Sequence, residues 1–171
     1  VADIVTAAVA AINAVVEMPV VAVDSATTVD LVSKWKGASA NDIVVEAVSP
    51  DSASISFAFT QPTSGAVNPT VDAALAQIGN VWETLVLNCL EVADTTALDA
   101  YSTFGEGRWG ALVRKPLLVF TGDVSSAVST ATTVSDARKT DRVNVQLVSP
   151  GSNDLPLVVA ARQLARIAVV A

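Results

Sequence analysis

The chain has 171 residues, 51% of them hydrophobic and 16% charged, so it can bury a core and does not have the composition of a disordered segment. Its net charge of −7, without any basic stripe, argues against direct binding to nucleic acid. The sequence has no histidine and one cysteine, which excludes His-dependent catalytic triads, His-containing zinc sites and an internal disulfide framework.

The first third of the chain is predicted to be a helix packed on a small antiparallel sheet. Apolar residues from Ile4 to Val16 recur at helical spacing, and the Met18-Pro19 pair is expected to stop this helix. Three strand signals follow: one runs from residue 20 through 33, the second covers 43–48, and the third covers 54–59. The last alternates between apolar and small residues, as a strand with one buried face does.

The segment 61–67 is the best candidate for a domain boundary, because it combines proline, serine and glycine. We therefore expect an α+β domain at 1–61 and an α/β domain at 62–171. In the second domain predicted strands alternate with helices, a pattern typical of βαβ units and a mostly parallel sheet.

The second domain is predicted to open with a short helix and a strand. Asn68 and Pro69 form an N-cap and first-turn pair, and Gly79 is expected to close the helix. A strand is predicted at 84–90, with Cys89 as one of its buried residues.

Two helices and two further strands are predicted next. Asp94 is expected to cap a helix that ends at Gly105, and a strand is expected at 117–121. Asp123 is expected to cap the following helix. The next strand, 143–148, is half polar, so we place it near an edge of the sheet.

The last segment is predicted to form a helix from Asp154 to the end, and its apolar run is interrupted by Arg162 and Arg166. The run is too short to span a bilayer, so we expect no membrane insertion. The two arginines lie four residues apart and share one helical face. They form either a solvated stripe or a contact for an acidic neighbouring subunit, and both interpretations stay open.

Motifs for nucleotide binding or nucleophilic catalysis are missing from the sequence. It contains no G-x-S-x-G elbow, no P-loop and no G-x-G-x-x-G fingerprint. The Gly-Glu-Gly-Arg run at 105–108 follows a predicted helix instead of a strand. Its amides are therefore expected to cap that helix and not to bind phosphate.

Three aspartates form the most site-like constellation. Asp94, Asp123 and Asp154 each follow a predicted strand, so in a parallel sheet they could meet at the carboxyl edge and hold Mg²⁺. Three ordinary helix N-caps explain the same positions without further assumptions. We favour the caps, and a small-ligand or magnesium-binding module is the alternative function.

Four segments, in the same order, resemble the sheath proteins of contractile phage tails, particularly the Mu-like group. They are the helix and turn at 7–20, the Lys-Gly and Asn-Asp-Ile turn at 35–43, the Asn-Pro to Trp stretch at 68–82, and the helix with Arg-Trp-Gly at 98–110. The resemblance implies a sheath core of subtilisin-like type, which has no subtilisin chemistry because the chain lacks histidine.

The resemblance also implies a role. It describes a structural subunit, not an enzyme and without a cofactor, that polymerises around the tail tube and contracts to drive the tube through the host envelope for genome ejection. The implied partners are other copies of the chain, the tail tube protein and the baseplate. The implied location is the virion tail, assembled in the host bacterial cytoplasm, and a pyocin or secretion-type injection machine is a close variant. Since the sequence starts without Met and ends within a helical pattern, we expect a fragment of a longer protein.

Overall fold

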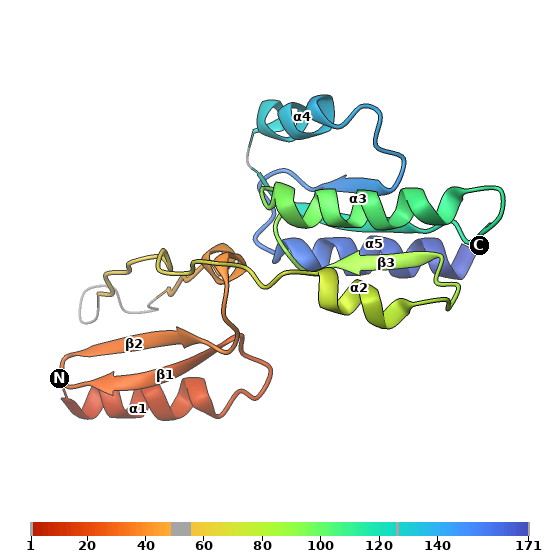
Figure 1. Cartoon of the computed structure of the whole chain (residues 1–171). Helices are drawn as coiled ribbons and strands as arrows, with labels where there is room; N and C mark the ends of the chain where they lie inside the picture. The colour runs from red at the N-terminus through yellow and green to blue at the C-terminus, as the bar shows by residue number, and fades with distance from the viewer. Residues whose placement is uncertain (1, 49–55, 126, 171) are drawn as a thin grey trace. The chain divides into compact units, whose positions relative to one another are not determined.

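The computed structural model describes residues 2–48, 56–125 and 127–170. The fold is α/β, with helices around a two-stranded antiparallel sheet and a three-stranded parallel sheet, which confirms the expected fold class (Figure 1). The chain divides into two compact units, Val1–Val67 and Asn68–Ala171. The division falls at the end of the proline- and glycine-containing segment 61–67.

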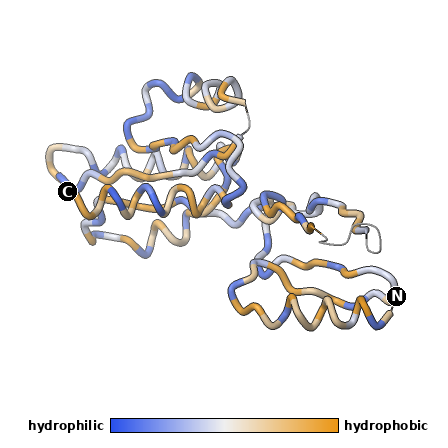
Figure 2. The backbone as a smooth tube through the Cα atoms, turned by 180° about the vertical axis from the view of Figure 1, so that it is seen from behind, coloured by the Kyte–Doolittle hydropathy of each residue, from blue (hydrophilic) through white to orange (hydrophobic). Residues whose placement is uncertain are grey.

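The first unit is built on helix α1 (Ala2–Asn13) and a hairpin of β1 (Val20–Ser25) and β2 (Thr28–Ser33). Figure 2 shows that both strands of this hairpin are rich in hydrophobic residues. Alternate residues of β1 are buried on one face, and the helix contacts both strands. At the end of α1, the Asn13 side chain donates to the Ala22 carbonyl and accepts from the Ala22 amide, each over 2.9 Å. This amide pair joins the helix to the sheet.

Two boundaries in this unit differ from the sequence predictions. The signal at 20–33 is a hairpin and not one strand, because the Asp24 carboxylate accepts from the Ala26 amide and Ala26 takes a φ of 65°. Helix α1 ends at Asn13 and not at the Met18-Pro19 pair. The Asn13 side chain binds the backbone of Ala22 in β1.

The prediction of strands at 43–48 and 54–59 was wrong for the residues described. Residues 43–48 and 56–59 form no strand, and 49–55 lie outside the described residues. A 3₁₀ helix, η1 (Ala38–Asp42), comes directly before the first of these segments. Both backbone groups of Val45 bond to the Gln61 side chain, so a side chain takes the place of a neighbouring strand. Alternating apolar residues form a strand only where a partner backbone is present.

The second unit is a three-layer arrangement around a parallel sheet. Its elements are α2 (Asp72–Ile78), β3 (Leu85–Asn88), α3 (Thr95–Trp109), β4 (Leu118–Asp123), α4 (Val128–Ala137), β5 (Asn144–Val148) and α5 (Pro156–Val170). The strand order is β3-β4-β5 with β4 in the centre, so the half-polar β5 is an edge strand, as expected. Helix α3 covers one face of the sheet and α5 the other. Among the described residues, no helix has the length and apolarity needed to cross a membrane.

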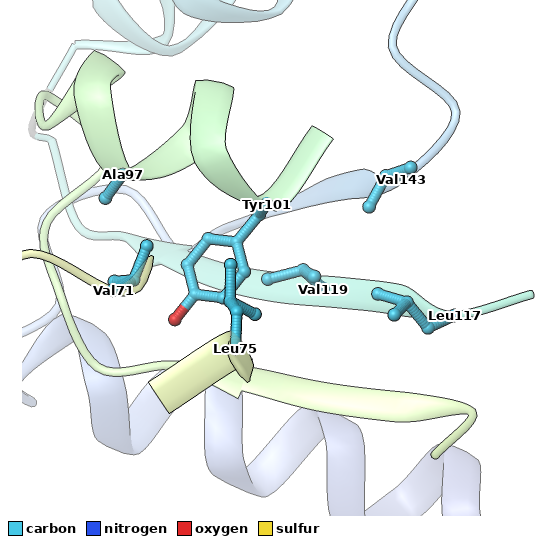
Figure 3. Close-up of a cluster of buried hydrophobic side chains, with 7 residues drawn as sticks. All are labelled: Val71, Leu75, Ala97, Tyr101, Leu117, Val119 and Val143. Carbon is cyan, nitrogen blue, oxygen red and sulfur yellow. The ribbon is translucent and has the colours of Figure 1, made fainter. Parts of the chain in front are cut away.

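The core of the second unit lies between the sheet and helices α2 and α3. Figure 3 shows its seven buried side chains: Val71, Leu75, Ala97, Tyr101, Leu117, Val119 and Val143. Burial raises the pKa of the Tyr101 hydroxyl. Alternation along β4 sends Val119 to this core, while Gly122 meets the start of α5, where an added Cβ would lie 1.8 Å from the Pro156 carbonyl oxygen.

The prediction that α3 ends at Gly105 was wrong, because the helix continues to Trp109. Gly105 packs against Val143, the residue directly before β5, and a Cβ at position 105 would lie 2.5 Å from both methyl groups of Val143. This glycine therefore allows a close helix–strand approach instead of ending the helix.

Two further predictions for the second unit were wrong, and one was right. Helix α2 begins at Asp72 and not at Asn68, although it ends at Gly79, with φ 49°, as expected. Cys89 is exposed because β3 already ends at Asn88, whose fully buried amide donates to the Thr121 hydroxyl over 3.0 Å.

Candidate functional site

Asp94 is the N-cap of α3, as predicted. Its carboxylate accepts from the Ala97 amide over 3.0 Å and from the Asn68 side chain over 2.9 Å. The cap thus also fixes the segment that leads into α2.

Asp123 is not a helix cap. It is the last residue of β4 and is buried, and α4 begins five residues later at Val128. Its two carboxylate oxygens accept from the Ser125 amide over 2.8 Å and from the Gln146 side chain over 2.6 Å. The side chain therefore fixes the turn after β4 to the neighbouring strand β5.

Asp154 lies two residues before α5 and forms an ion pair with Arg162, which is part of α5. All three aspartates are thus engaged by donors from their own chain. Within the described ranges, no group of three or more His, Cys, Asp or Glu residues could hold a metal ion. The three carboxylates do not form the cluster that the magnesium alternative requires.

Arg162 and Arg166 are both exposed on α5. Arg162 already has an intrachain partner in Asp154, whereas Arg166 forms no ion pair with any described residue.

The Asn-Asp-Ile turn holds two distant parts of the first unit together. The Asn41 side chain accepts from the Gly65 amide over 2.8 Å and donates to the Gly65 carbonyl over 3.0 Å. A Cβ at Gly65 would lie 2.5 Å from the Gly37 carbonyl oxygen, so the two segments touch backbone to backbone. The turn is a structural clamp within the fold.

The Arg-Trp-Gly segment contains a second clamp. Arg108 is only 6% exposed, at the end of α3, and its guanidinium lies 5.1 Å from the centre of the Phe104 ring. It donates to the carbonyls of Gly79 over 2.7 Å, of Val81, and of Lys115 over 3.3 Å. One buried cation thereby joins the end of α2, the segment before β3 and the segment before β4.

Sequence reasoning treated this arginine only as part of a motif and missed its role. The available signal was its spacing: Arg108 follows Phe104 by four residues and Tyr101 by seven, which places it on the buried face of the helix.

An ion-pair ladder connects α3 to the segment before β5. Arg138 pairs with Asp99 over 2.8 Å and with Asp141 over 3.3 Å, and Arg142 pairs with Glu106. The hydrogen bond from Arg142 lowers the pKa of the Glu106 carboxyl. Burial acts to raise the pKa of Asp141, but hydrogen bonds from the Asn144 side chain and nearby amides outweigh it and hold that pKa below its ordinary value.

Three cavities of the second unit stand out, and the one beside the Asp94 cap has a volume of about 250 Å³. One of about 100 Å³ lies against Leu98, Arg138 and Asn144, far below the roughly 300–1,000 Å³ of ligand pockets. The buried Asn144 Oδ1 has no hydrogen-bond partner among the described residues, and a water molecule could supply one. An open groove of about 510 Å³ follows the ion-pair ladder, whose arginines are already bound to its carboxylates.

No family model matches this chain, and neither a curated protein nor a solved structure shows significant similarity to it. Its function is therefore inferred from its own residues and their contacts.

Proposed function

We propose that this chain is a structural subunit of a contractile tail sheath and not an enzyme. One observation carries the proposal: three polar residues of the sheath-like segments, Asn13, Asn41 and Arg108, all bind backbone groups of their own unit. A catalytic or ligand-binding side chain would instead present polar atoms to a cavity. The resemblance therefore rests on residues that maintain a shape.

The architecture is compatible with this role. A sheath subunit must move between two packings as a nearly rigid body, and the second unit, a sheet covered on both faces by helices, is suited to that. We propose that this unit corresponds to the subtilisin-like sheath core. Its partners would be other copies, the tail tube protein and the baseplate, in a virion tail assembled in the host cytoplasm or in a pyocin or secretion-type machine.

The arginine pair on α5 is a proposed subunit contact. Residues 1–61 carry two basic and seven acidic side chains, a net charge of −5, and so offer partners on an adjacent copy. Arg166 has no ion pair among the described residues and can bind such a partner directly. Arg162 would first have to release its ion pair with Asp154. Long charged side chains can exchange partners without unpacking a core.

Self-assembly tests the proposal. The complete gene product, expressed alone and viewed by negative-stain electron microscopy, is expected to form tubes with a regular axial repeat. A product that stays dispersed at every concentration, in low and high salt, would contradict the sheath role.

A further inference from the structure

The amino end of the parallel sheet in the second unit carries a group of exposed apolar side chains. Trp82 is 59% exposed and Leu112 is completely exposed, and Val81, Trp109 and Val113 beside them in the chain are exposed as well. These five residues define the amino-end surface. Four of them lie on the segments that lead into β3 and β4, and Trp109 is the last residue of α3. These segments are at the same end of the unit as the C-terminal end of α5 in Figures 1 and 2.

The base of this surface is held rigidly. The Lys115 amide donates to the Arg108 carbonyl over 3.0 Å, and the Lys115 ammonium donates to the Asn80 carbonyl. The Trp82 indole donates to the Pro116 carbonyl over 3.3 Å. With the Arg108 clamp, these bonds fix the two segments to each other, so little conformational entropy would be lost on binding.

The same surface is locally basic in an acidic protein. Apart from the buried Arg108 clamp, residues 79–84 and 108–116 contain two cations, Arg114 and Lys115, against one acid, Glu83. Arg142 lies over the Trp109 ring at 5.7 Å, with its charge balanced by Glu106. The sheet end therefore combines aromatic and aliphatic groups with a surplus of positive charge.

The first unit also carries an exposed apolar surface, but its surroundings are acidic. On the hairpin face turned away from α1, Val21 lies opposite Val32 in the register, and Val23 lies opposite Asp30. Val21 is 42% and Val32 54% exposed. This outer hairpin face is apolar, has an acidic residue within it and belongs to a unit with an excess of acid.

We propose that the amino-end surface of one copy docks on the outer hairpin face of a second copy. Each surface is apolar and is left uncovered by the described residues of its own unit, and the charges of the two surfaces are complementary. Tryptophan is enriched at the centre of protein interfaces, and charged groups lie mostly at the rim. The contact joins two different surfaces, so it propagates from copy to copy.

The inference rests on the proposal that copies of this chain pack together, and it adds which surfaces meet. Two variants of exposed residues test it: Leu112→Asp at the amino-end surface and Val32→Lys on the hairpin. Val128→Asp is the control, because Val128 is exposed in the first turn of α4, where an acid is well tolerated.

Sedimentation equilibrium of the chain at about 1 mM, where even a weak contact is populated, gives the readout. The unmodified chain and the control are expected to form dimers and longer species, and each test variant alone is expected to be monomeric. An equimolar mixture of the two test variants should recover dimers and nothing larger, because each copy retains one intact surface. Circular dichroism verifies that both variants are folded.

Three results would overturn the inference: a monomeric unmodified chain, association unaffected by either variant, or a mixture that stays monomeric. If the true partner is a protein other than a second copy, the unmodified chain is expected to be monomeric. The sheath proposal is judged separately. If the complete gene product forms tubes and its Leu112→Asp form does so equally well, the docking inference is wrong and the sheath role stands; if the unmodified product forms no tubes, the sheath role fails.

Discussion

The two units of this chain are stabilised in different ways. The second unit has a buried core between a parallel sheet and its covering helices, and its polar clamp, Arg108, joins segments around that core. The first unit has one helix on a two-stranded hairpin, and residues 34–48 and 56–67 contain no strand. There, amide side chains such as Asn41 and Gln61 take over the bonding of neighbouring backbone. The comparison shows that side chain–backbone clamps supplement a core in the second unit, and that in the first unit they take the place of strand pairing in the segment after the hairpin.

The largest expected effect comes from removing the clamp of the second unit. Arg108→Ala leaves three carbonyls without their donor and should lower the free energy of unfolding of that unit by about 3 kcal/mol. Amide exchange should accelerate in β4 and not in β1. Arg114→Ala removes an equal charge from an exposed site and should change stability by less than about 0.5 kcal/mol. Equal effects of the two changes would show that Arg108 is no clamp.

The two glycines in α3 allow a matched comparison. Gly105→Ala places a methyl group against Val143 and should destabilise the second unit by about 1–3 kcal/mol. The free-energy cost of this overpacking exceeds the stabilisation expected from the higher helix propensity of alanine. Gly107→Ala meets nothing within 4 Å and should stabilise the same helix by about 0.5–1 kcal/mol. Urea denaturation measures both. If both alanines stabilise the protein, the close contact between Gly105 of α3 and Val143 before β5 does not exist in solution.

In the first unit, Asn41→Ala removes both bonds to Gly65 and should destabilise that unit alone, by about 1–2 kcal/mol. The Gly65 amide should lose protection from hydrogen exchange, while the backbone amides of β4 in the second unit should remain protected. Loss of protection in both units at once would show that they do not unfold independently.

The smallest effect concerns the ion-pair ladder. The pKa of Glu106 is lowered mainly by the hydrogen bond from Arg142, so Arg142→Gln should raise it toward the ordinary glutamate value. A lowered carboxyl pKa means that this stabilisation is present above the ordinary pKa and is lost as the pH falls through the folded-state value. NMR titration of the Glu106 carboxyl carbon measures the shift. Arg138→Gln, which removes a neighbouring arginine with other partners, should leave the Glu106 titration unchanged.

The sequence predicted the second unit better than the first for a physical reason. Strands such as β4, which are covered on both faces, give continuous apolar runs between helices, and their parallel pairing follows from that alternation. The clean alternation at 54–59 gave no strand among residues 56–59, because alternation does not reveal whether a partner strand exists. Gly105 was misread because a helix-ending glycine and a close-packing glycine look alike in sequence.

The candidate site was harder to predict than the fold. Arg162 and Arg166 were correctly placed on one helix, but the ion pair from Arg162 to Asp154 was not foreseen. The contacts from Asn41 to Gly65 and from Arg108 to Gly79 span 24 and 29 residues and follow no local period. Only the folded chain brings these partners together.

A cryo-electron microscopy reconstruction of the complete gene product tests the central claim most directly. The account predicts a helical tube of repeating copies in which Arg108 still donates to the Gly79 carbonyl and Asn41 still binds Gly65. A discrete particle in which these side chains release the backbone and bind a small ligand would contradict a structural role for this chain.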